Sequence, residues 1–274
     1  MIVRKSFKFS LFSLLLLILS LLAFPVHASA ETTLTVFAAA SMTESMNMIA
    51  ASYKKSAPDV KIVYNFDSSG TLKTQLEQGA ECDVFISAGQ KQMDQLDINA
   101  NPKVNTKKLD FIMPGTRFNV VSNKVVLVVP KGHNSKGISD FKDTLTDKVF
   151  IIALGNSDVP VGQYSEEVLK SLGIWDKLKK MNKISYGSNV KEVLSQVAAG
   201  AADCGMVYST DAATSNAVEV VAEAPNGTHR PITYPVAILK GTQNLEAATA
   251  FTNFLKGPES RKIFTGIGFA IPSK

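Results

Sequence analysis

The chain has 274 residues, of which 45% are hydrophobic and 19% are charged, with 29 basic and 24 acidic side chains. All acidic residues follow position 30 and three basic ones precede it, so the remaining chain carries 26 minus 24, a net charge of +2. This balance, without a dense Lys/Arg patch interleaved with aromatic residues, argues against nucleic-acid binding.

The first 30 residues have the pattern of a secretory signal peptide. Three basic residues precede the apolar run 11–22, and the small residues Ala28-Ser29-Ala30 follow it. We expect cleavage after Ala30 and a mature protein in the periplasm. An uncleaved membrane anchor is the alternative, but the apolar run is close to the lower length of a membrane span. Neither cysteine lies near the cleavage site, so nothing there offers a thioether lipid anchor.

From residue 31 on, strand patterns alternate with helical patterns, which favours α/β architecture with mostly parallel sheets. The strands are expected, in chain order, at 33–37, 60–66, 83–87, 125–129, 150–153, 184–186, 205–208, 218–222 and 234–239. The helices are expected at 42–55, 71–78, 162–172, 190–199, 247–255 and 259–265. Residues 99–121 are predicted to form a long irregular connection.

Two segments of the chain resemble each other. In both 75–87 and 196–209, a helix ends at Gly-Ala and a strand follows that closes in an aromatic-to-serine step. The repetition indicates two lobes of like construction, although coincidence is the alternative. Cys82 and Cys204 would then occupy related positions in different lobes, so we expect no disulfide between them.

The first strand ends in an unusual way. The run Thr35-Val-Phe-Ala-Ala-Ala-Ser41 passes directly into a helix, whose first N–H groups have no partner inside the helix and lie at the positive end of its dipole. Three alanines leave room for a small anion to reach these donors. The alternative is that Ser41 and Glu44 form a capping box, in which the serine only satisfies its own helix.

Later junctions also present neutral donors. A Ser/Gly turn around Ser69 can form an anion-binding concavity, and Val161 follows a proline at a helix start, where its N–H is unpaired. Asn189 is expected to cap a helix and to leave the N–H of Val190 near its end. The hydroxyl of Tyr208 closes the strand 205–208.

Each of these features has an ordinary interpretation as a helix cap or a core tyrosine. Together they form a set of neutral donors, which suits a fully ionised anion. A protonated phosphate would require a carboxylate acceptor, and only Asp67 is placed to offer one.

Signatures of an enzyme are weak. Outside the leader, the chain has two histidines, His133 and His229, both in surroundings typical of exposed loops. No G-x-S-x-G elbow flanks Ser41 or Ser69, and two distant cysteines without an H-E-x-x-H motif argue against a zinc site. A secreted serine hydrolase using either serine stays an alternative that would need one of these histidines as its base.

The chain is similar to the periplasmic molybdate-binding components of ABC transporters over essentially its whole length after the leader. The similarity is carried by Thr35-Val-Phe-Ala-Ala-Ala-Ser41, Asp83-Val-Phe-Ile-Ser-Ala88, Val159-Pro-Val-Gly-Gln-Tyr164, Gly205-Met-Val-Tyr-Ser-Thr-Asp-Ala212, Tyr234-Pro-Val-Ala237 and Phe254-Leu-Lys-Gly-Pro258. The resemblance implies a type II periplasmic binding-protein fold, with two similar α/β lobes of mixed, mostly parallel sheets joined by crossing strands. The implied organisation is a signal peptide at 1–30, a discontinuous first lobe at 31–122 plus 235–274, and a second lobe at 123–234.

The resemblance also implies how a ligand is held. Ser41 and Ser69 would donate from the first lobe, and Val161, Val190 and Tyr208 from the second. The ligand would be molybdate or tungstate, which the sequence does not separate, with no cofactor, no catalytic residue and no metal ligand beyond the oxyanion's donors. An ABC permease in the membrane would be the partner of a monomeric protein. A receptor for sulfate, phosphate or an organic solute is the alternative within this class.

Asp67 departs from the pattern of that family, which commonly has a small neutral residue at this position. A carboxylate facing the cleft would repel a dianion. We therefore expect Asp67 to point outward or to pair with a cation.

Overall fold

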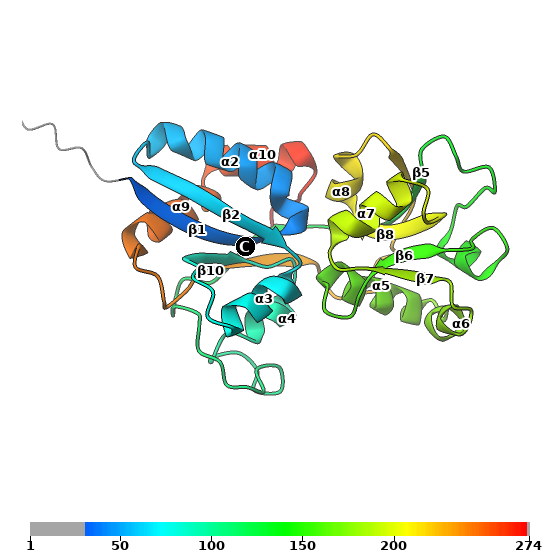
Figure 1. The fold of residues 1–274 in the computed structure, drawn as a ribbon, viewed down its shortest axis with the longest axis horizontal. Coiled ribbons are helices and arrows are strands. Elements are labelled where there is room, and N and C mark those ends of the chain that lie inside the picture. The colour runs from blue at the N-terminus through cyan, green and yellow to red at the C-terminus, as the bar shows by residue number, and fades with distance from the viewer. Residues whose placement is uncertain (1–30, 273–274) are drawn as a thin grey trace, which may run out of the picture. The chain divides into compact units, whose positions relative to one another are not determined.

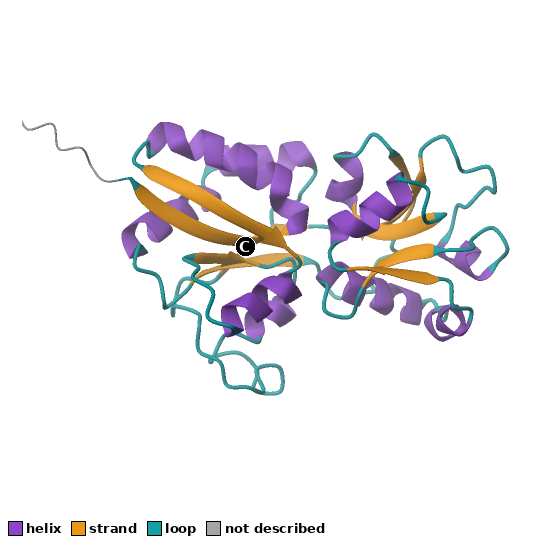
Figure 2. Cartoon of the chain, viewed as in Figure 1, coloured by secondary structure: helices purple, strands orange, loops and turns teal. Residues whose placement is uncertain are grey.

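The computed structural model describes residues 31–272, so the predicted signal peptide lies outside the described residues. From Thr32 on, the described chain forms one compact unit. Its strands form two sheets of five strands each, flanked by helices (Figures 1 and 2).

The first sheet has the strand order β2-β1-β3-β10-β4. Its strands are β1 (Thr32–Ala39), β2 (Val60–Asp67), β3 (Val84–Ile86), β4 (Phe118–Ser122) and β10 (Thr233–Ile238). β1 pairs in parallel with β2 and β3, whereas β10 runs antiparallel to both β3 and β4. The helices of this part of the chain are α2 (Thr43–Ser56), α3 (Ser69–Glu77), α4 (Gln90–Asp94), α9 (Leu245–Lys256) and α10 (Pro258–Ile267), with the 3-10 helix η2 (Ala40–Met42) before α2.

The second sheet repeats this plan, with the strand order β7-β6-β8-β5-β9. Its strands are β5 (Val125–Pro130), β6 (Ile152–Gly155), β7 (Ile184–Gly187), β8 (Cys204–Tyr208) and β9 (Val218–Glu223). Again the fourth strand in the order, here β5, is antiparallel to its two neighbours. The helices are α5 (Pro160–Ser171), α6 (Trp175–Lys180), α7 (Val190–Ala198) and α8 (Ser209–Ala213), with the 3-10 helix η3 (Phe141–Leu145).

The chain crosses between the sheets twice. β4 ends at Ser122 and β5 begins at Val125, and β9 ends at Glu223 before β10 begins at Thr233. This confirms the predicted architecture of two similar lobes with mixed sheets joined by crossing segments. The sheets are not mostly parallel as predicted, because each has two parallel and two antiparallel strand pairings. The residue boundaries proposed for the lobes stay a prediction.

Buried apolar faces explain why these elements form. On α2, Met46, Ile49 and Tyr53 recur on one helical face and are all buried, as their spacing predicts. Strands β3 and β8 are buried along their whole length, as is typical of strands covered on both faces.

The internal repetition in the sequence corresponds to two like units. α3 is followed by Gly79, with φ +91°, and by β3, whereas α7 is followed by Gly200, with φ +70°, and by β8. Both glycines adopt the left-handed conformation that ends many helices. Cys82 and Cys204 are both buried and free in the structure, and they lie just before β3 of the first sheet and in β8 of the second.

Some elements differ from the prediction. The connection expected at 99–121 ends in a regular strand, β4, which pairs with β10. The short helices α4, α6 and α8 were not predicted, because five or six residues are too few to show a helical period. In residues 31–272, no helix is long and apolar enough to cross a membrane.

Candidate functional site

A small cavity lies where residues of both lobes meet. Its volume is about 10 Å³, room for about one water molecule, and it is partly open to solvent. It is lined by Ala39, Ala40, Ser41, Ser68, Ser69, Ala88, Val159, Pro160, Val161, Val190 and Tyr208. All five residues proposed from the sequence, Ser41, Ser69, Val161, Val190 and Tyr208, are therefore brought together around one cavity. Their binding of an anion stays a prediction.

Ser41 lies in η2 and is buried. The capping-box interpretation of its side chain is wrong, because α2 begins at Thr43 and its N-cap residue, Met42, makes no side-chain cap bond. The Ser41 hydroxyl instead lies 3.0 Å from the hydroxyl of Tyr234. Ser41 is thus free of the helix and faces the cavity.

Two adjacent serines at the start of α3, Ser68 and Ser69, form different hydrogen bonds. Ser68 is the N-cap and its hydroxyl accepts the N–H of Thr71 at 3.1 Å. The hydroxyl of Ser69 accepts the N–H of Ala88 at 2.8 Å, which leaves its own proton for another acceptor. Ser69 can therefore offer both its hydroxyl proton and its N–H to a ligand.

Val161 is placed by tight packing at the start of α5. Pro160 occupies the first helical position, and the N-cap residue Val159 makes no side-chain cap bond. A side chain at Gly162 would overlap the backbone of Gly155 and Asn156, so only glycine lets the helix start so close to the end of β6. The N–H of Val161, in the first turn, has no acceptor within the helix.

Val190 is the first residue of α7. The side chain of Asn189 accepts the N–H of Glu192 at 3.0 Å, so the predicted cap is confirmed. Because this cap satisfies a later N–H, that of Val190 stays unused by the helix and lines the cavity.

Tyr208 closes β8 with a fully buried side chain. Within residues 31–272, its hydroxyl has no hydrogen-bond partner. Burial raises the pKa of Tyr208 well above its ordinary value of 10.0, so the phenol stays neutral and keeps its proton. A buried hydroxyl without a partner is costly, and here it lies on the cavity.

The lining of the cavity contains no charged side chain. Its donors are hydroxyl groups and the N-termini of α3, α5 and α7, whose dipoles place partial positive charge toward the cavity. This combination can hold an anion by hydrogen bonds alone.

Contacts between the two lobes surround the cavity. Lys191 of α7 binds both carboxylate oxygens of Glu44 of α2 at 2.9 Å. Gly70 of α3 lies so close to the carbonyl of Asp158 that a side chain at position 70 would overlap it. These contacts join the two lobes directly beside the cavity.

Asp67 also takes part in the contacts between the lobes. This corrects the expectation that it points outward or pairs with a cation. Its carboxylate accepts the N–H of Ser68 at 2.6 Å and the side-chain amide of Asn189, on the other lobe, at 3.2 Å. The partner is thus a neutral amide, and among the described ion pairs none involves Asp67. Asp67 is half-buried and does not line the cavity.

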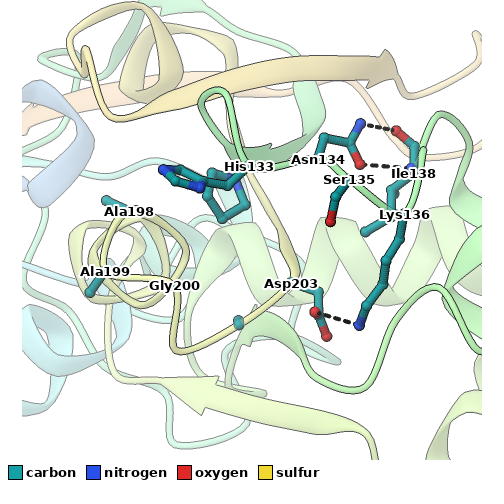
Figure 3. A pocket seen from close by; sticks show the side chains of 11 residues that line it. His133, Asn134, Ser135, Lys136, Ile138, Ala198, Ala199, Gly200 and Asp203 are labelled. Carbon is teal, nitrogen blue, oxygen red and sulfur yellow. Dashed lines mark hydrogen bonds and ion pairs between the residues drawn. The ribbon is translucent and has the colours of Figure 1, made fainter.

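A larger hollow on the second lobe lies apart from these residues (Figure 3). His133 lines this hollow. Two other polar side chains of its lining are paired: Asn134 forms two hydrogen bonds of 2.8 Å with the backbone of Ile138, and Lys136 lies 3.2 Å from Asp203. His229 packs against the ring of Tyr164. Neither histidine lines the cavity with Ser41 and Ser69, so the hydrolase alternative has no base at its proposed nucleophiles. No group of three or more His, Cys, Asp or Glu side chains in the described residues is arranged to hold a metal ion.

Sequence reasoning missed two residues near the site. Tyr234 of β10 binds Ser41, and Asn123, between β4 and β5, binds Tyr234 at 3.2 Å. Tyr234 opens one of the segments that carry the family resemblance, but nothing local in the sequence indicates that its hydroxyl reaches a serine 193 positions away.

The fold and this interlobe cavity define a solute-binding protein of two lobes. The chain belongs to the family of bacterial extracellular solute-binding proteins, which matches residues 34–270.

Named relatives agree with this assignment. The chain is 36% identical to the molybdate-binding protein ModA of Haemophilus influenzae, over 93% of this chain and 95% of the relative. It is 38% identical to the ModA protein of Escherichia coli, over 91% and 95% of the two chains. Among solved structures, the periplasmic molybdate-binding protein of Azotobacter vinelandii matches with a TM-score of 0.75 at 28% identity, covering 88% of this chain and all of that chain.

Proposed function

We propose that this protein binds molybdate or tungstate in the cavity between its lobes and delivers it to an ABC permease. The single observation that supports this most is the donor set itself: three helix N-termini, two serine hydroxyls and an unpartnered tyrosine hydroxyl around a cavity without a charged side chain. The names of the similar proteins from Haemophilus influenzae and Escherichia coli point to the same ligand.

The donors explain how a dianion is taken out of water. Transfer of an ion from water is costly unless each of its oxygens is hydrogen-bonded. Ser41 and Ser69 approach from the first lobe, whereas Val161, Val190 and Tyr208 approach from the second. Only closure of the lobes completes the shell, so binding and hinge closure are coupled.

Selectivity follows from charge state and size. Phosphate carries a proton near neutral pH and would need an acceptor, but no carboxylate lines the cavity. Sulfate has the same charge as molybdate but shorter bonds to oxygen, so in a cavity of fixed size it reaches fewer donors. Molybdate and tungstate are nearly equal in size, and the donor set gives no reason to prefer either.

Localisation and delivery follow from the class. We infer that the signal peptide is cut after Ala30 and that the mature protein acts as a monomer in the periplasm. The closed form would be the species that the permease recognises, since only this form carries the ligand. No cofactor is needed for binding.

Titration calorimetry with the mature chain tests the proposal, using molybdate, tungstate, sulfate and phosphate in the same buffer. We expect saturable binding of the first two and at least tenfold weaker binding of the others. The ligand should also raise the melting temperature, by the free energy that mass action gives to a ligand that binds only the folded state. Equal affinity for sulfate would contradict the assignment in favour of a general oxyanion receptor.

A further inference from the structure

The orientation of the Asn123 side chain is fixed by its neighbours. Its Oδ1 accepts the N–H of Lys124 at 2.9 Å and the hydroxyl of Ser209 at 3.0 Å. A backbone N–H can only donate, so the oxygen of Asn123 must face Lys124. Its amino group therefore faces the other way, toward Thr210 Oγ1 at 2.9 Å and the hydroxyl of Tyr234 at 3.2 Å.

This orientation determines where the Tyr234 proton goes. Tyr234 is fully buried, and its hydroxyl has two hydrogen-bond partners in the described chain, Asn123 and Ser41. The amino group of Asn123 can only donate, so the oxygen of Tyr234 accepts from it. The proton of Tyr234 is left to be donated to Ser41 Oγ, at 3.0 Å.

We propose that Asn123 and Tyr234 form a directed hydrogen-bond relay that turns the hydroxyl proton of Ser41 toward the bound oxyanion. Because Ser41 Oγ accepts from Tyr234, its own proton is not needed in this contact and is available to the cavity. Tyr234 is therefore a positioning residue for the ligand, although it does not line the cavity. The inference rests on the proposed function, which it deepens.

The residues of the relay lie at the two crossings between the lobes. Asn123 lies in the first crossing between the lobes, and Tyr234 lies in β10 just after the second. Through Asn123, the relay begins at Ser209 and Thr210 of α8 and ends at Ser41 of η2. A donor of the first lobe is thus oriented by groups from the crossing segments and the second lobe.

A double-mutant cycle tests the relay, with molybdate and tungstate titrated into each variant by calorimetry. Tyr234→Phe keeps the ring and removes the donor, so the Ser41 hydroxyl is free to rotate. We expect the affinity to fall about three- to tenfold, as for loss of one hydrogen bond. In the Ser41→Ala background, the same change should alter the affinity by less than about twofold, since the residue through which Tyr234 acts is gone.

Asn123→Asp gives a second, isosteric test that does not rely on the tyrosine variant. A carboxylate in place of the amide accepts the proton of Tyr234, so Ser41 must donate its proton to Tyr234 and withholds it from the ligand. The added charge also repels an anion. The Ser41→Ala background measures this repulsion alone, and we expect a larger loss of affinity when Ser41 is present.

Tyr64→Phe is the matched control. Tyr64 donates its hydroxyl proton to the carbonyl of Met46 at 2.9 Å, remote from the cavity lining. It should lower the melting temperature as a lost hydrogen bond does, while the affinity stays unchanged.

The outcomes separate the two proposals. If the wild-type protein binds neither molybdate nor tungstate, the proposed function fails and the relay fails with it. If the wild type binds, but Tyr234→Phe and Asn123→Asp cost the same factor with and without Ser41, the relay alone is wrong. A loss that depends on Ser41 for both variants supports it.

Discussion

At the scale of the residue, the hydroxyl of Tyr208 is the most informative group in the molecule. It is buried and makes no hydrogen bond with any described residue, although tyrosine hydroxyls in protein interiors usually find a partner. Its neighbours Tyr164 and Tyr234 pack their rings against it and offer it no acceptor. The Tyr208 hydroxyl is therefore available to an acceptor in the cavity, as the proposed binding of an anion requires.

Replacement of this hydroxyl should therefore separate stability from binding. We expect Tyr208→Phe to leave the ligand-free protein as stable as the wild type or slightly more stable, because it removes an unpaired buried polar group. The affinity for molybdate should fall roughly tenfold or more, as for a hydrogen bond to a charged group. Thermal melting and calorimetry of the same samples measure both effects, and an unchanged affinity would exclude Tyr208 from the site.

At the scale of the element, the shared feature is the helix N-terminus. α3, α5 and α7 all begin at the cavity, and each leaves a backbone N–H there that no substitution other than proline removes. Three of the proposed donors are thus backbone N–H groups at helix starts rather than side-chain groups.

Proline at position 190 offers a way to delete one of these N–H groups. Val190 is the first residue of α7, where proline is favoured, and Asn189 has φ −154° and ψ 172°, a conformation that a following proline accepts. We expect Val190→Pro to fold with near-wild-type stability and to lose roughly tenfold to a hundredfold in affinity.

Val190→Ala is the control for this change, because it alters the side chain but keeps the N–H. Its affinity should stay within a few-fold of the wild type. Similar losses in the alanine and proline variants would show that the side chain of Val190, rather than its N–H, matters for binding.

Much of this arrangement could be predicted from the sequence, because each donor follows from a local pattern. The proline before Val161 and the asparagine before Val190 mark helix starts by themselves. The capping interpretation of Ser41 failed because the chain first makes a 3-10 turn, which delays α2 to Thr43. The bond between Ser41 and Tyr234, and strand β4, depend on pairing between distant segments, which no local pattern encodes.

At the scale of the whole molecule, a charged cluster ties the lobes together behind the cavity. Lys191 binds Glu44 across the lobes and lies 3.0 Å from Oδ1 of Asp211, as an ion pair, although neither oxygen of Asp211 has a partner at hydrogen-bond geometry. Burial raises the pKa of Asp211 to about 6, and the opposing effect of Lys191 does not restore it to the ordinary range. Burial by itself lowers the pKa of Lys191, but Asp211 and Glu44 raise it overall, so Lys191 stays charged.

This cluster predicts how stability depends on pH. In the unfolded chain the pKa of Asp211 is about 4, so between pH 4 and 6 the folded protein binds more protons and its stability falls as the pH rises. Asp211→Asn removes this titration. Relative to the variant, the wild type should lose about 2 kcal/mol of unfolding free energy between pH 4 and pH 7.

Urea denaturation of both proteins at several pH values in this range measures the difference. Parallel profiles would show that Asp211 keeps an ordinary pKa in the folded protein. A profile in which the wild type gains stability with rising pH would reverse the assignment, and would mean that Lys191 outweighs burial.

The close approach of Gly70 to the carbonyl of Asp158 forms a stop, that is, a contact that limits how far the two lobes can close. Because the backbone of Asp158 blocks the space beside Gly70, we expect that the lobes cannot close further on an anion that is too small. Gly70→Ala would insert a spacer at the stop. We expect it to weaken binding of molybdate and to narrow the ratio between molybdate and sulfate affinities, as measured by calorimetry. An unchanged ratio of affinities would mean that the hydrogen-bond donors, rather than the contact at Gly70, determine which size of anion the protein prefers.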